Sequence, residues 1–104
     1  MNVHFFIDPE TESPHIYRHS VSEAEVEEVL LRSGEDRPGQ EGARVAIGRT
    51  SSGRYLRVIY TLDVEADSVF IITAYELRGK PLTAYQRRIR RNKNETEQIS
   101  IRLG

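Results

Sequence analysis

Residues 44–77 read RVAIGRT-SSG-RYLRVIYTL-DVEAD-SVFIITAYEL, and this stretch decides the fold. It holds three runs rich in β-branched and aromatic residues, separated by two short polar turns, the first of which ends at Gly53. Strands joined by turns this short pair antiparallel, so the stretch predicts a three-stranded meander. The third run, Ser68–Leu77, has apolar residues at adjacent positions, which predicts a central strand covered on both faces.

The residues before the meander predict one strand and two helical segments. Val3–Ile7 is a short β-branched and aromatic run and predicts a first strand. Ser13-Pro14 has the form of an N-cap followed by proline, so a short helical turn should follow it. Ser22-Glu23-Ala24-Glu25 is a capping-box sequence and predicts a helix over residues 22–33. Residues 35–43 hold a proline and two glycines and predict a loop.

A basic helix is predicted after the meander. Its start is either Pro81 or the second capping-box pattern at Thr83–Gln86. Leu82, Tyr85 and Ile89 recur at helical spacing and share one face, while basic residues cover the remainder. We expect this helix to lie at the edge of the sheet or beside its open face.

The last residues predict a separate element. Asn92–Thr96 is polar and predicts a break after the basic helix. Ile99, Ile101 and Leu103 then alternate with polar residues, so Gln98–Leu103 predicts an edge strand of its own sheet or of a second copy's sheet. A disordered terminus is the alternative.

Length and composition fit one small domain. The 104 residues are 38% hydrophobic and 30% charged, as in folded globular proteins, and contain no cysteine for disulfides or thiolate chemistry. The order of segments predicts an α+β fold. In it, an antiparallel sheet, made of the N-terminal strand and the meander, packs on the N-terminal helix. Residues 1–93 form this domain, and residues 94–104 form a C-terminal tail.

The charges are strongly segregated although the net charge is only −1. Residues 1–36 hold two arginines against nine acidic residues, whereas residues 78–93 hold seven basic residues and no acidic one. A concentrated basic segment predicts a polyanionic partner, and RNA is our first expectation. No signal peptide is evident and no apolar run approaches the ~20 residues of a membrane helix, so we expect a cytoplasmic protein without membrane contact.

Several short motifs occur together in a characteristic order. They are His19-Ser20-Val21, Glu27-Glu28-Val29, Ile47-Gly48-Arg49-Thr50, Gly53-Arg54, Leu56-x-Val58-x-Tyr60 and Ile72-Thr73-Ala74. In this order they resemble the BrnT-type toxins of the RelE/ParE superfamily, which belong to type II toxin–antitoxin systems. The resemblance covers residues 15–91.

The resemblance implies a compact ribonuclease-like fold, metal-independent cleavage of RNA, and a cognate antitoxin that covers the toxin and gives the complex DNA-binding ability. Whether cleavage needs the ribosome is left open. Two features depart from the family pattern. Tyr75 stands where BrnT-like chains usually carry a basic residue after the segment matching Thr73-Ala74, and the tail after Lys93 is additional. The alternative is therefore a non-catalytic RNA- or protein-binding module on the same fold.

RNA cleavage without a metal needs a base for the 2′-hydroxyl, cations for the phosphorane oxygens and an acid for the leaving 5′-oxygen. The candidate catalytic residues are His19, Arg54, Tyr75, Glu76, Lys80 and Arg88, with Tyr85 as a weaker candidate proton donor. Histidine titrates near neutral pH, which favours His19 as the base. Tyr75 and Glu76 point to opposite faces of one strand, and the alternation alone does not say which one faces a cleft.

The basic segment supplies the candidate RNA contacts. They are Arg78, Lys80, Arg87, Arg88, Arg90, Arg91 and Lys93. His15 and His19 have the spacing of a helical metal pair, but the glutamate that zinc proteases carry after the first histidine is replaced by Ile16. We therefore expect no metal and no cofactor. A homodimer is left open.

Overall fold

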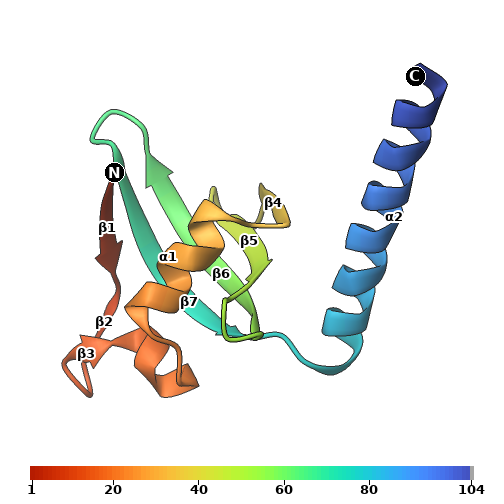
Figure 1. The fold of residues 1–104 in the computed structure, drawn as a ribbon. Coiled ribbons are helices and arrows are strands. Elements are labelled where there is room, and N and C mark those ends of the chain that lie inside the picture. The colour runs from red at the N-terminus through yellow and green to blue at the C-terminus, as the bar shows by residue number, and fades with distance from the viewer. Residues whose placement is uncertain (104) are drawn as a thin grey trace.

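A five-stranded mixed sheet forms the centre of the protein in the computed structural model of the chain (Figure 1). The structure describes the backbone of residues 1–103 and the side chains of residues 1–92. The strands are β1 (Asn2–Phe5), β4 (Glu35–Pro38), β5 (Arg44–Arg49), β6 (Tyr55–Asp63) and β7 (Ser68–Glu76), in the spatial order β1-β7-β6-β5-β4. A separate small sheet pairs β2 (Ile7–Asp8) with β3 (Ser13–Pro14).

The predicted meander is confirmed, because β5, β6 and β7 pair antiparallel in sequence order. The prediction of an antiparallel sheet is wrong for the N-terminal strand, since β1 pairs parallel to β7, with Asn2 opposite Ser68. β1 and β7 are far apart in the chain, and no tight turn forces them to run in opposite directions. The predicted loop is also partly a strand, because β4 pairs with β5 from Glu35 to Pro38. An edge strand tolerates a terminal proline, which has no amide hydrogen to donate.

Helix α1 (Glu23–Leu31) covers one face of the sheet, as Figure 1 shows. The predicted capping box is present: the Ser22 hydroxyl accepts from the Glu25 amide, and the Glu25 carboxylate accepts from the Ser22 amide. Val26 and Val29 are fully buried in the core under the helix. The 3₁₀ helix η1 (His15–His19) leads into α1 and packs against β7.

The opposite face of the sheet is largely open. β7 is central in the sheet, but Phe70 and Ile72 are exposed on its open face, so the expectation of cover on both faces is wrong. β7 also contains a β-bulge. β6 and β7 pair in register from Asp63 to Tyr60, and Ile72 is then skipped, so that Ile59 pairs with Thr73. The bulge places two neighbouring residues on one face, and this interrupts the alternation that the sequence suggests.

The first turns of helix α2 (Gly79–Leu103) pack against the body of the fold. Leu82, Tyr85 and Ile89 form a second apolar cluster with Ile47 and Leu77. A side chain at residue 34 would overlap the Tyr85 hydroxyl, so Gly34 permits this close approach.

The backbone of α2 continues without a break to Leu103, so the predicted edge strand at Gln98–Leu103 is wrong. The polar segment Asn92–Thr96 contains neither glycine nor proline, and polarity alone does not end a helix. Residues 94–103 are therefore the end of α2. Within the described residues, no helix combines the length and apolar character needed to cross a membrane.

Candidate functional site

A row of aromatic and imidazole rings runs from the N-terminal segment to β7. The ring centroids of Phe6 and His15 lie 6.1 Å apart, those of His15 and His19 lie 5.3 Å apart, and those of His19 and Tyr75 lie 6.0 Å apart. His19 and Tyr75 are thus two predicted site residues that the fold brings together. They come from η1 and from the end of β7, which lie side by side.

Arg57 completes this group and was not among the predicted site residues. It pairs with Tyr75 across β6 and β7. Its guanidinium lies 5.8 Å from the centre of the Tyr75 ring, and its Nη1 donates to the Tyr75 hydroxyl over 3.1 Å. A cation therefore stands beside Tyr75, on the neighbouring strand. An arginine within a strand on an otherwise apolar face was the signal in the sequence.

The side chain of His15 contacts a buried carboxylate, that of Asp8. Its Nδ1 lies 3.3 Å from Asp8 Oδ2, and the Arg18 Nε lies 2.6 Å from the same oxygen. The Glu10 amide, the His15 side chain and Arg18 together lower the pKa of Asp8 in spite of its burial. An ionised Asp8 holds the His15 ring against His19, which limits the positions that the His19 ring can take.

Arg54 and Glu76, two other predicted catalytic residues, lie together on the α1 side of the sheet. Arg54 Nη1 donates to both Glu25 carboxylate oxygens and to the Ser20 carbonyl, each over 2.9 Å. Its Nη2 lies 3.7 Å from Glu76, which also receives a 2.8 Å hydrogen bond from Arg78. Arg78, with help from Arg54, lowers the pKa of Glu76. Arg54 is thus occupied by carboxylates, and Glu76 is a weak base.

Arg88 joins α2 to β4. Its Nε and Nη2 donate to the two Glu35 carboxylate oxygens over 2.6 and 3.1 Å, and this hydrogen-bonded pair raises the pKa of Arg88. Tyr85, one turn earlier, is buried, and burial raises the pKa of its hydroxyl. Both residues therefore hold the helix in place.

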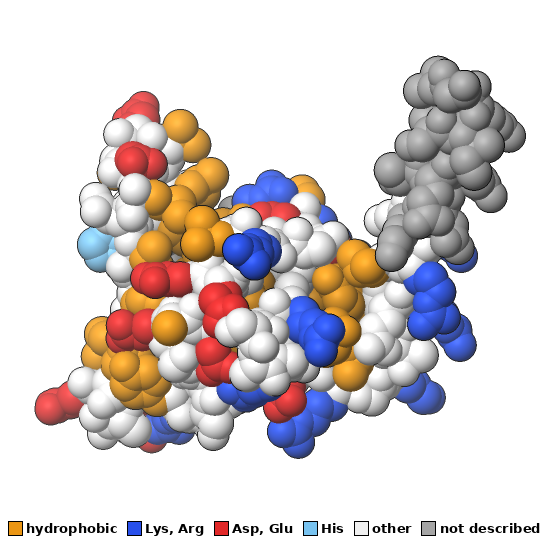
Figure 2. Space-filling model, viewed as in Figure 1, with side chains coloured by type: hydrophobic (Ala, Val, Ile, Leu, Met, Phe, Trp, Pro, Cys, Tyr) orange, Lys and Arg blue, Asp and Glu red, His pale blue; other side chains and the backbone are white. Residues whose placement is uncertain are grey.

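Other basic residues of α2 are exposed and make no ion pair within the described part of the chain. They are Lys80, Arg87, Arg90 and Arg91. Arg87, Arg90 and Arg91 have the spacing of one helix face. Figure 2 shows basic side chains over the described part of α2 and acidic ones over the α1 side of the body. The side chain of Lys93 lies outside the described residues.

Comparison of this chain with models of protein families, with curated proteins and with solved structures finds no match.

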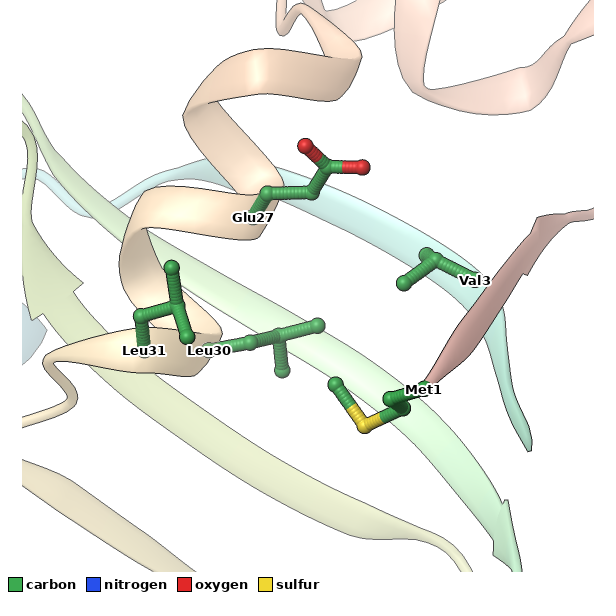
Figure 3. A pocket seen from close by; sticks show the side chains of 5 residues that line it. All are labelled: Met1, Val3, Glu27, Leu30 and Leu31. Carbon is green, nitrogen blue, oxygen red and sulfur yellow. The ribbon is translucent and has the colours of Figure 1, made fainter. Parts of the chain in front are cut away.

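Among the hollows in the described part of the surface are two with largely apolar linings. One, of about 350 Å³, opens on the open face of the sheet beside Arg57 and Tyr75. The other, of about 320 Å³, lies between α1 and β1, where the Met1 and Leu30 side chains extend toward each other (Figure 3). Apart from Glu27, its lining is apolar and offers no group for proton transfer. The described residues contain no cluster of three or more His, Cys, Asp or Glu side chains that could hold a metal ion.

The open face therefore combines three different chemical capacities. Histidine can exchange a proton near neutral pH. Arginine can hold a phosphate through charge-assisted hydrogen bonds. The Tyr75 hydroxyl accepts from Arg57, which leaves its own hydrogen free to donate. This is the set that the cleavage of a phosphodiester without a metal requires.

Proposed function

We propose that this protein is a BrnT/RelE-like toxin that binds single-stranded RNA and cleaves it without a metal, using His19, Arg57 and Tyr75 on the open face of the sheet. One observation carries the proposal: Tyr75 of β7 lies against the His19 ring of η1 on one side and accepts a hydrogen bond from Arg57 of β6. Arg57 supplies the cation that the resemblance leads one to expect at residue 75.

In the proposed reaction, His19 removes the proton from a ribose 2′-hydroxyl, and the 2′-oxygen attacks the adjacent phosphorus. The bond from phosphorus to the 5′-oxygen breaks, and the Tyr75 hydroxyl donates a proton to that leaving oxygen. Arg57 holds the negative charge of the phosphorane between these steps. The products are a 2′,3′-cyclic phosphate and a free 5′-hydroxyl, so no water or metal enters the cleavage step.

The exposed arginines of α2 supply the contact with the RNA backbone in this proposal. Arg87, Arg90 and Arg91 have no carboxylate partner among the described residues, whereas Arg54 and Arg88 are held by Glu25 and Glu35. We therefore assign backbone binding to the first set and structural roles to the second. An antitoxin with an acidic surface would cover the same arginines.

The test is an RNA-cleavage assay with purified protein in the presence of a chelator, with and without ribosomes. His19→Ala should lower the cleavage rate roughly 100-fold or more, because it removes the general base. His4→Ala, an exposed histidine on β1, is the matched control and should cleave like the wild type. Tyr75→Phe should also lose activity, with Tyr17→Phe as its control.

The alternative is an RNA-binding module without catalysis, and the tyrosine at residue 75 favours it. Wild-type protein that binds RNA and leaves it intact in every condition, and does not slow the growth of bacteria that express it, would decide for this alternative.

A further inference from the structure

The two edges of the central sheet are protected very differently. At one edge, β4 has the sequence EDRP, and Arg88 of α2 forms an ion pair with its Glu35. Charged residues and proline on an edge strand are common means by which proteins prevent pairing with another chain. At the other edge, β1 has the sequence NVHF, without Lys, Arg, Asp, Glu or Pro, and it pairs with β7 in an unbroken register. The β1 edge is therefore open to the addition of a further strand (Figure 1).

The free side of β1 carries hydrogen-bonding groups of the backbone. The amides of Asn2 and Phe6 both donate toward β7. Backbone groups alternate in direction along a strand, so the amide and carbonyl groups of Val3 and Phe5 point away from β7. Within the part of the chain that the structure describes, no strand covers this side of β1. An antiparallel strand would meet two donors and two acceptors there.

Apolar side chains are exposed beside both ends of this edge. Met1 precedes β1 and is 65% exposed, and Ile7 follows the strand and is 50% exposed. On the α1 side, Leu31 is 78% exposed and lines the hollow between α1 and β1, as Figure 3 shows. Exposed apolar side chains next to an unpaired strand edge mark a surface that another chain can cover.

We propose that β1 pairs with β1 of a second copy of this chain, antiparallel about a two-fold axis, and so joins the two sheets into one. Val3 then exchanges backbone hydrogen bonds with Phe5 of the second copy, and Phe5 does so with the second copy's Val3. The same register brings Met1 of each copy opposite Ile7 of the other, so the apolar ends of the strand cover each other.

The charges of the edge favour a second copy over a charged partner. β1 has no charged side chain, so two copies of it meet no like-charge repulsion, and a charged segment would find no ion-pair partner on the strand. A two-fold interface also requires a surface that is complementary to itself, which the reversed strand provides. None of the four paired residues belongs to the candidate site, so the inference does not depend on RNA cleavage.

The experiment is analytical ultracentrifugation of the full chain over a series of concentrations. The wild type should approach twice the mass of the chain as the concentration rises. Val3→Pro removes an amide that points away from β7, so β1 keeps its bonds to β7 while the dimer loses two hydrogen bonds, one from each copy. The dissociation constant of the dimer should therefore rise roughly 30-fold. Val3→Ala, which loses the same side chain and keeps the amide, is the matched control and should dimerise like the wild type.

Hydrogen exchange of the wild type tests the same edge without a substitution, and it decides the matter if Val3→Pro does not fold. The amides of Val3 and Phe5 should exchange more slowly as the protein concentration rises, whereas that of Gln40, in the turn beside the other edge, should not change. A wild type that stays monomeric at every concentration overturns the proposal. So does a dimer that a folded Val3→Pro does not weaken, or one whose Val3 and Phe5 amides stay unprotected. The RNA-cleavage assay is unaffected by either result, so the proposed function stands or fails separately.

Discussion

The salt dependence of RNA binding can be calculated from the ion pairs of the protein. Binding to a single strand releases counterions, and each phosphate contact contributes about −0.7 to the slope of log affinity against log salt concentration. Five cationic side chains on the open face or on α2 have no carboxylate partner among the described residues. They are Arg57, Lys80, Arg87, Arg90 and Arg91. The expected slope is therefore about −3.5.

Substitution of Arg87, Arg90 and Arg91 together by glutamine should reduce the slope to about −1.4, because two contacts remain. Arg87→Gln alone should change it by about 0.7. Arg32→Gln removes one exposed positive charge at the end of α1 and is the matched control; its slope should equal that of the wild type.

The assay is fluorescence anisotropy of a labelled 2′-O-methyl RNA, titrated with protein at four or more salt concentrations. Circular dichroism of each variant confirms that α2 remains folded. A triple variant that keeps the wild-type slope would show that RNA does not contact this face of α2. The assignment of binding and structural arginines from their ion pairs would then be wrong.

Four further predictions concern stability. Arg54→Met should lower the free energy of unfolding in urea by about 1–2 kcal/mol, since it removes a pair whose side chains are only 26% and 17% exposed. Burial opposes ionisation of Glu25, but the hydrogen bonds from Ser22 and Arg54 lower its pKa overall. The free energy of unfolding should therefore fall as the pH drops below 4.5, the ordinary pKa of a glutamate, and it should fall less in Arg54→Met. Ser22→Ala should cost about 1 kcal/mol through loss of the N-cap, measured in the same way. Tyr85→Ala should cost about 3 kcal/mol, and an unchanged urea midpoint would show that α2 contributes nothing to the body of the fold.

Local features of the sequence specify several elements without any contact between distant segments. The capping box at Ser22 predicts the start of α1, and the side chain of Glu25 reaches back to the Ser22 amide in the structure. The short turns between the strand runs predict the meander. The spacing of Leu82, Tyr85 and Ile89 predicts the packed face of α2. Each of these features depends on residues within a few positions of one another, so the sequence carries the whole cause.

Other features depend on contacts between distant segments, and only the tertiary structure decides them. The parallel pairing of β1 with β7 and the ion pairs of Arg54 and Arg88 join residues that are 29 or more positions apart. The two ion pairs distinguish Arg54 and Arg88 from the arginines that have no carboxylate partner among the described residues, and the composition of residues 78–93 does not reveal this difference.

The candidate site itself depends on one such feature. A regular alternation along β7 would carry Tyr75 to the α1 face, and the turn between β6 and β7 sets a register in which Arg57 does not meet it. The bulge at Ile72 moves the end of β7 by one residue and brings Tyr75 opposite Arg57, where its ring also lies 6.0 Å from that of His19. A bulge arises from the balance of packing on the two faces of a sheet, so the strand's own sequence does not specify it.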